Sequence, residues 1–207
     1  MSFKTDQENF WAGEFGKEYI NRNTLTDETL AQSLGIWSSI LRHCPSAINT
    51  VLELGSNIGI NLHALKILLP SAQLTAVEIN SSAVETLRKW GGAEVVEASL
   101  FDVTFEGTHD FVFTSGVLIH CNPDLLPQAY AVMAKASSRY VCIMEYYNPT
   151  PVSVIYRNNT EKLFKRDFAG EFLDLHPEFI LREYGFVYHR DSKFPGGDLT
   201  WFLMEKV

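Results

Sequence analysis

A strand followed at once by a glycine turn and a helix constrains this chain most. Val51, Leu52 and Leu54 form a short apolar run, and the turn Gly55-Ser56-Asn57-Ile58-Gly59 interrupts it before helically spaced residues resume. Glycine lets backbone approach a ligand where a Cβ would intrude, and the first turn of a helix presents free N–H groups. The stretch 50–62 therefore predicts a turn that cradles a small molecule.

Length and charge narrow the class of protein. The 207 residues contain no Pro/Gly/Ser-rich linker, which favours one α/β core, and the net charge of −8 without a Lys/Arg run argues against a nucleic-acid partner. We expect a cytoplasmic protein that does not bind membranes, because no apolar run is long enough to span a bilayer. We also expect a monomer or a weak homodimer. Cys44, Cys121 and Cys142 lack C-x-x-C spacing, so we interpret them as core residues and expect no metal site.

Strands alternate with helices along most of the chain. Apolar runs at 50–54, 73–79, 94–98, 109–116 and 139–145 predict strands. Helices are expected after an N-cap at Thr26, after Gly59, after an N-cap at Ser81 or Ser82, over 123–136, and near Phe168. Stretches 180–190 and 199–206 predict a late antiparallel hairpin. The expected fold is α/β, with a mostly parallel seven-stranded sheet, helices on both faces, and ligands at the carboxyl ends of the strands.

The glycine turn departs from the dinucleotide fingerprint G-x-G-x-x-G, because Asn57 and Ile60 occupy two of its glycine positions. It fits acid-x-Gly-x-x-x-Gly better, with Glu53 at the strand end and Gly59 at the start of the helix. In this it resembles the class I S-adenosylmethionine-dependent methyltransferases, which have a Rossmann-like fold. Asn57 replaces the usual middle glycine, and Asn tolerates left-handed backbone.

The resemblance implies S-adenosylmethionine (SAM) as cofactor and S-adenosylhomocysteine (SAH) as product. It assigns cofactor contacts to the turn, to an acid that holds the ribose, to the loop after the third strand, and to the end of the fourth: Glu53, Gly55, Ser56, Asn57, Gly59, Glu78, Ile79, Ser99, Leu100, Ser115 and Gly116. The family's adenine-binding acid aligns with Ser99, and Asp102 is the alternative if the loop curls.

An aromatic segment precedes the core. Trp11, Phe15, Tyr19 and Arg22 suggest a lid over the cofactor, with Tyr19 and Arg22 on one helical face, although a flap that merely covers the edge of the core fits the same pattern. We expect residues 1–25 to form the lid and 26–207 to form one methyltransferase domain. Within that domain, the long polar connection 148–170 is expected to be an insertion on the acceptor side.

The phrases from Phe10 to Asn23, Gly116 to His120 and Glu145 to Pro149 resemble methylases associated with pseudaminic acid biosynthesis and bacterial surface-glycan gene clusters. The resemblance implies a glycan-precursor acceptor. His120 and Glu145 are the candidate general bases, because each follows a strand at the mouth of the cofactor site. The residues expected at the acceptor are Tyr146, Tyr147, Asn148, Tyr156, Arg157 and Asn158, and neighbouring Lys165 and Arg166 favour an anionic one.

The leading hypothesis is a SAM-dependent methyltransferase. It would act on O or N of a small anionic metabolite or a surface-glycan precursor such as a sugar, a nucleotide sugar or a phosphate-bearing group. Two alternatives stay open. One is a SAM-binding regulatory or scaffold protein without turnover, suggested by Asn57 and Ser99. The other is a nicotinamide oxidoreductase, weakened by the missing glycines.

Overall fold

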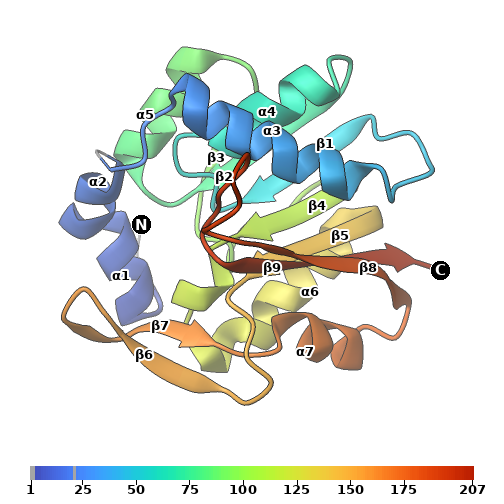
Figure 1. Ribbon diagram of the computed structural model, residues 1–207. Helices are drawn as coiled ribbons and strands as arrows, with labels where there is room; N and C mark the ends of the chain where they lie inside the picture. The colour runs from blue at the N-terminus through green and yellow to red at the C-terminus, as the bar shows by residue number, and fades with distance from the viewer. Residues whose placement is uncertain (1–2, 21) are drawn as a thin grey trace.

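The computed structural model describes residues 3–20 and 22–207. A seven-stranded sheet with the order β3-β2-β1-β4-β5-β9-β8 forms its centre (Figure 1). The first five strands are parallel, and β9 pairs antiparallel with both β5 and β8. Their bounds are β1 (Thr50–Leu54), β2 (Gln73–Glu78), β3 (Glu94–Glu97), β4 (His109–Ser115), β5 (Ser137–Glu145), β8 (Phe179–Val187) and β9 (Leu199–Lys206). The expected sheet, with its late antiparallel hairpin, is confirmed.

Helices cover both faces of the sheet, as Figure 1 shows. The first face carries α3 (Asp27–Leu41), α4 (Ile60–Leu68) and α5 (Ser81–Trp90), and the second carries α6 (Leu126–Ala136) and α7 (Phe168–Leu175). Alternation along β4 explains the two cores, because Phe111 and Phe113 pack with Trp37 on the first face while Val112 joins the second. The parallel strands are therefore buried on both sides.

Two helix starts differ from the sequence prediction. The N-cap of α5 is Asn80 rather than Ser81 or Ser82, because the Asn80 side chain accepts a hydrogen bond from the backbone N–H of Ser82 at 3.1 Å. The predicted helix 123–136 begins as a 3-10 turn, η2 (Pro123–Leu125), before α6. In contrast, the predicted cap Thr26 accepts from the backbone N–H of Thr29 in α3.

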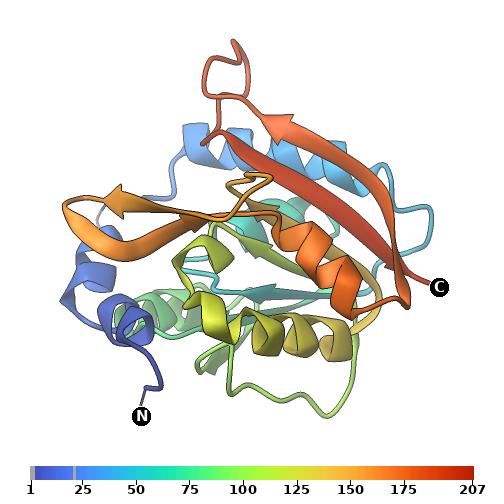
Figure 2. The same ribbon diagram turned by 90° about the horizontal axis from the view of Figure 1, so that it is seen from below.

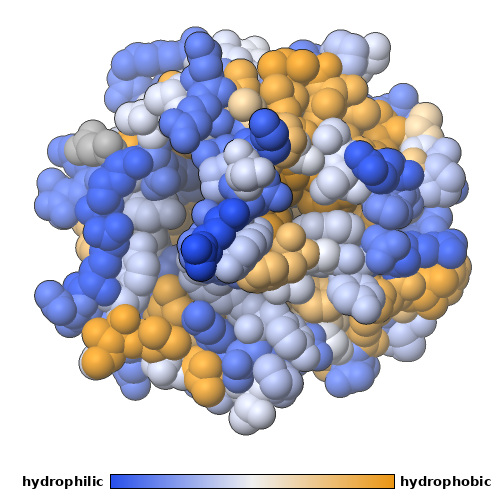
Figure 3. Space-filling model, viewed as in Figure 1, coloured by the Kyte–Doolittle hydropathy of each residue, from blue (hydrophilic) through white to orange (hydrophobic). Residues whose placement is uncertain are grey.

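The connection between β5 and α7 is not an irregular loop. It contains a two-stranded hairpin, β6 (Val152–Tyr156) and β7 (Asn159–Lys165), whose turn residues Arg157 and Asn158 have φ of 47° and 67°. Such turns are usually marked by glycine, and this one carries none. Val152 and Ile155 are exposed on the hairpin, and apolar atoms gather over it at the lower left of Figure 3.

Two short helices lie at the carboxyl edge of the parallel strands. These are α1 (Asp6–Ala12) and α2 (Glu14–Ile20), and Figure 2 shows them beside the β6–β7 hairpin. A capping box starts α1, because Thr5 and Glu8 satisfy each other's backbone N–H groups. Within the described residues, no helix is long and apolar enough to cross a membrane.

Candidate functional site

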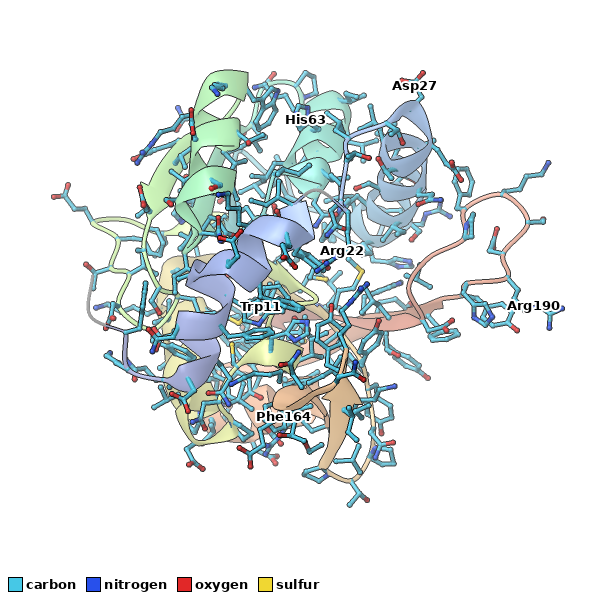
Figure 4. The ribbon with its side chains drawn as sticks, turned by 90° about the vertical axis from the view of Figure 1, so that its left-hand side faces the viewer. Trp11, Arg22, Asp27, His63, Phe164 and Arg190 are labelled. Carbon is cyan, nitrogen blue, oxygen red and sulfur yellow. The ribbon has the colours of Figure 1, made fainter. Side chains whose placement is uncertain are left out.

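A cavity of about 420 Å³ opens where the parallel strands end. Its walls come from the β1–α4 turn, the loops after β2, β3 and β4, helices α1 to α3, and the segment 195–199 between β8 and β9. Figure 4 looks onto this edge, with Trp11 and Arg22 near the centre and His63 and Arg190 towards the periphery. The cavity lies where a parallel α/β sheet binds its ligands.

Left-handed backbone shapes the β1–α4 turn. Gly55, Asn57 and Gly59 have φ of 78°, 47° and 82°. A Cβ at Gly55 would lie 2.5 Å from Cγ2 of Val117, and one at Gly59 would lie 2.6 Å from Cδ2 of Leu87. Gly55, Ser56 and Asn57 line the cavity, whereas Gly59 packs behind it as the N-cap of α4. The turn therefore requires glycine on two counts, backbone conformation and close packing.

Glu78 joins two of the loops. Its Oε2 accepts from the backbone N–H of Asn57 at 2.7 Å, and its Oε1 accepts from those of Ile79 and Asn80 at 2.9 and 2.7 Å. Burial raises the pKa of Glu78, and the three N–H donors oppose that shift. A carboxylate has about four lone-pair positions, so one is left for a ligand in the cavity. Glu78 and Ile79 both line the wall, where the resemblance places the ribose.

Glu53 is a buried carboxyl at the end of β1. Its Oε1 accepts from Nδ2 of Asn61 at 2.7 Å, and its Oε2 has no hydrogen-bond partner among residues 3–20 and 22–207. Trp37 Nε1 and Ser33 Oγ donate to Oδ1 of Asn61, which fixes the orientation of that amide. Burial raises the pKa of Glu53 to about 8, so the carboxyl is mostly protonated at neutral pH. Sequence reasoning missed Asn61 and Ser33, which also line the cavity.

The loop after β3 contains both residues considered for adenine binding, Ser99 and Asp102, and the structure places them differently. Ser99 and Leu100 line the cavity and Asp102 does not. The hydroxyl of Ser99 accepts from the backbone N–H of Phe101 at 3.2 Å, and Asp102 forms an ion pair with Lys4. Asp102 is therefore engaged on the surface rather than in the cavity.

The loop after β4 presents His120. Its Nδ1 lies 2.6 Å from the carbonyl oxygen of Lys162 in β7, so the N–H is at Nδ1 and Nε2 carries the lone pair. Burial lowers the pKa of His120 to about 4, so the ring is neutral at physiological pH. The ring lies 4.4 Å from that of Trp11, and both residues line the cavity. Ser115 and Gly116, at the end of β4, line it as well.

Glu145 does not line the cavity. It is 2% exposed, its Oε1 accepts from the backbone N–H groups of Val117 and Leu118 at 3.0 and 3.1 Å, and its Oε2 accepts from that of Ile119 at 3.3 Å. These donors belong to the 3-10 turn η1 (Leu118–His120) and the residue before it. Burial raises the pKa of Glu145 to about 7. The geometry makes Glu145 an anchor for the loop that carries His120.

The aromatic N-terminal residues divide into two groups. Trp11 and Tyr19 line the cavity, with ring centroids 5.1 Å apart. Phe15 and Arg22 do not line it, and the Arg22 guanidinium lies 5.3 Å from the ring of Phe15 and 5.5 Å from that of Tyr19. Arg22 follows the end of α2, and its backbone N–H donates to the carbonyl of Tyr19 at 3.1 Å, which keeps the two side chains on one side of the segment.

The residues expected at the acceptor do not line the cavity. The ring of Tyr156 lies 5.0 Å from that of His120 in the wall, and the Arg157 guanidinium lies over the Tyr156 ring at 5.8 Å. Tyr147 is exposed and packs near Phe202, and Lys165 lies over the ring of Tyr146. The expected set is completed by Asn148 and Asn158, neither of which lines the cavity.

Other lining residues came from no motif. They include Gln7, Glu8, Gln32, Ile36 and the segment 195–197. The Pro-Gly-Gly run in that last segment was visible in the sequence, but it signalled only a turn. Within the described part of the chain, no group of three or more His, Cys, Asp or Glu side chains could hold a metal ion.

Comparisons with known proteins agree with this geometry. A family model described as a methyltransferase domain matches residues 51–138, from β1 into β5. A search of curated protein sequences finds no match.

Solved structures share the fold over nearly the whole chain. A SAM-dependent methyltransferase from Leishmania major aligns with a TM-score of 0.72 at 15% identity, covering 98% of this chain and 87% of that one. Magnesium protoporphyrin IX methyltransferase from Synechocystis PCC 6803, with bound SAH, gives 0.69 at 13% identity, covering 99% and 100%. The Burkholderia thailandensis 1,6-didemethyltoxoflavin-N1-methyltransferase, with 1,6-didemethyltoxoflavin and SAH bound, gives 0.66 at 16% identity, covering 97% and 87%.

The sheet order, the glycine turn and the acid at the end of β2 define the Rossmann-like fold of class I methyltransferases. Together with the matched domain, this fold supports an enzyme of the SAM-dependent methyltransferase class. Structures of this fold have been solved with bound SAM and SAH, which is consistent with SAM as cofactor.

Proposed function

We propose that this protein transfers a methyl group from SAM to O or N of a small anionic acceptor, with His120 as general base. The observation that carries the proposal is the orientation of His120. The hydrogen bond from Nδ1 to the Lys162 carbonyl leaves the lone pair on Nε2 of a residue in the cavity wall.

SAM, when bound, supplies a methyl group on a sulfonium that is already a good leaving group. The protein then has to orient the acceptor towards the methyl group and to exclude water. Orientation alone can lower the activation barrier by about 7–11 kcal/mol. Glu78, Ser99 and the β1–α4 turn would hold the nucleoside and the amino-acid portion. Nε2 of His120 would accept the proton that the acceptor O or N loses on methylation, and the electrons of the C–S bond would remain on the sulfur of the cofactor.

Positive charge on the β6–β7 hairpin supports an anionic acceptor. Arg157, Lys162 and Lys165 lie over the rings of Tyr156, Phe10 and Tyr146, and none of the three forms an ion pair among the described side chains. Arg166, by contrast, pairs with Glu171. We assign 148–170 to acceptor binding on this basis.

Residues 1–25 are proposed as the lid over the cofactor. Trp11 and Tyr19 contribute to the cavity wall, and Gln7 donates to the carbonyl of Glu161 at 3.0 Å, which joins α1 to the hairpin. The lid and the acceptor segment therefore meet above the same cavity, and 26–207 makes up the remaining methyltransferase domain.

A surface-glycan precursor is the acceptor class that we propose, on the phrases resembling the pseudaminic acid-associated methylases. Proteins of this fold act on acceptors as different as magnesium protoporphyrin IX and 1,6-didemethyltoxoflavin, so the fold does not select the acceptor. The net charge of −8 favours a small-molecule acceptor over nucleic acid. A monomer or weak homodimer remains our expectation.

Calorimetry with SAH and NAD, followed by transfer of labelled methyl from SAM to cell-extract fractions, tests the proposal. Wild type should bind SAH and not NAD. His120→Gln should retain SAH affinity while transfer falls by about a hundred- to ten-thousandfold. His63→Gln is the matched control, because His63 stacks on Trp90 away from the cavity and should change neither quantity. Binding of NAD without binding of SAH would overturn SAM as the cofactor. Full activity of His120→Gln would overturn His120 as the general base.

A further inference from the structure

Glu8 has a buried carboxylate oxygen without a donor. The residue lies on α1, is 5% exposed and lines the cavity. Its Oε2 accepts from the backbone N–H groups of Lys4 and Thr5, both at 2.9 Å, and from the Thr5 hydroxyl at 3.1 Å. Its Oε1 is shielded from solvent and has no hydrogen-bond partner in the described parts of the chain. Burying an unpaired carboxylate oxygen is costly, so a donor from a bound molecule would be favourable.

The position of α1 shows which part of the cavity Glu8 serves. The Lys4–Asp102 ion pair ties the start of α1 to the loop after β3. Glu8 lines the same cavity as Ser99, Leu100 and Phe101 of that loop. Glu8 also lines the same cavity as Val117, His120 and Cys121 of the loop after β4. Glu8 therefore covers the space between these two loops.

That space has the character of a purine slot. Ile79, Ala98, Leu100 and Phe101 supply apolar surface, and Glu78 stands next to it at the end of β2. An exocyclic amino group in the slot needs an acceptor. The Ser99 hydroxyl already accepts from Phe101, and Asp102 is paired with Lys4. Oε1 of Glu8 is buried, lacks a donor among the described residues, and belongs to a residue of the cavity wall.

We infer that Glu8, on the N-terminal helix, accepts a hydrogen bond from the exocyclic amino group of the cofactor's adenine. This inference rests on the proposed function, since it takes SAM or SAH as the occupant. It gives the N-terminal segment a second role, because a residue of the proposed lid then recognises the adenine ring. It also supplies a carboxylate inside the cavity, where Asp102 of the loop after β3 does not reach.

Calorimetry with SAH and with S-inosylhomocysteine, in which a 6-oxo group replaces the amino group, tests the assignment. Wild type should bind SAH about ten- to a hundredfold more tightly, because the 6-oxo group is an acceptor facing a carboxylate. Glu8→Gln keeps an amide oxygen for the N–H groups of Lys4 and Thr5 and turns an N–H donor towards the cavity. Its preference for SAH should fall by at least about tenfold.

Thr5→Ala is the control for the helix cap. It removes the Thr5 hydroxyl from Oε2 and leaves Oε1 in place, so it should lower thermal stability without changing the ratio of the two affinities. Equal ratios in wild type, Glu8→Gln and Thr5→Ala would overturn the inference. A Glu8→Gln variant that loses methyl transfer with an unchanged ratio would also overturn it and assign Glu8 to the acceptor. Failure of wild type to bind SAH would instead refute the proposed function.

Discussion

Replacing Gly55 with alanine tests whether the glycine turn is built against the loop that carries His120. Gly55 has φ of +78°, and an added Cβ would lie 2.5 Å from Cγ2 and 2.8 Å from Cγ1 of Val117. Gly116 provides the matched comparison, because it has φ of +67° but open space around its Cβ position. Both substitutions impose left-handed backbone on alanine, and only Gly55→Ala adds a steric collision.

The two terms give a difference that can be measured. Left-handed backbone costs an L-residue about 1–2 kcal/mol, which is the whole expected loss for Gly116→Ala. Overpacking adds about 1–3 kcal/mol, so Gly55→Ala should lose about 2–5 kcal/mol in total. Val117→Ala removes both colliding methyl groups, and in the Gly55→Ala background it should restore the overpacking part of about 1–3 kcal/mol.

Urea unfolding of the two single glycine variants, of Val117→Ala and of the double variant measures these free energies. The double-mutant cycle isolates the contact between Gly55 and Val117, provided that the slope of each unfolding curve is unchanged. Equal losses in Gly55→Ala and Gly116→Ala, or a cycle without coupling, would refute the reasoning. The cradle would then be independent of the loop after β4.

Three further predictions concern the same edge of the sheet. Burial raises the pKa of Glu53 from its ordinary value of 4.5 to about 8, so the folded state holds a proton that the unfolded chain releases, and stability should fall as pH rises across that range. Glu53→Gln should reduce this loss in urea unfolding at pH 5.5 and 8.5; an identical loss in wild type and variant would contradict it. Asn80→Ala removes the acceptor for the Ser82 N–H at the start of α5 and the hydrogen bond to the carbonyl of Trp11, so it should lower the free energy of unfolding by about 1–3 kcal/mol. Ser82→Ala should leave stability nearly unchanged. Equal losses for the two variants in thermal unfolding would exclude Asn80 as the cap. Arg22→Ala should weaken SAH binding by about two- to fivefold, the worth of an exposed cation–π contact; unchanged affinity in calorimetry would leave the N-terminal segment as a cover only.

Local patterns predicted the elements that their own residues stabilise. The apolar runs of the sheet, the cap at Thr26 and the glycine turn could be read directly, because each depends on side chains a few positions apart. The β6–β7 hairpin was missed for the same reason. Its turn takes left-handed backbone at Arg157 and Asn158, and no glycine marks it.

The candidate site divides in a similar way. Glu78 and Ser99 were found because they follow strands whose ends must meet at one edge of the sheet. Tertiary structure alone decided how the rest is used. Glu145 accepts from the backbone of a distant loop, a carbonyl of β7 orients His120, and Glu8 reaches the cavity from 91 positions before Ser99. Backbone N–H and carbonyl groups occur at nearly every residue, so the sequence does not mark which of them a side chain will contact. Such contacts are decided by how distant segments pack. The sequence by itself therefore determined the sheet and the cofactor turn, and only the folded chain determined which carboxylates face the cavity and which hold its loops in place.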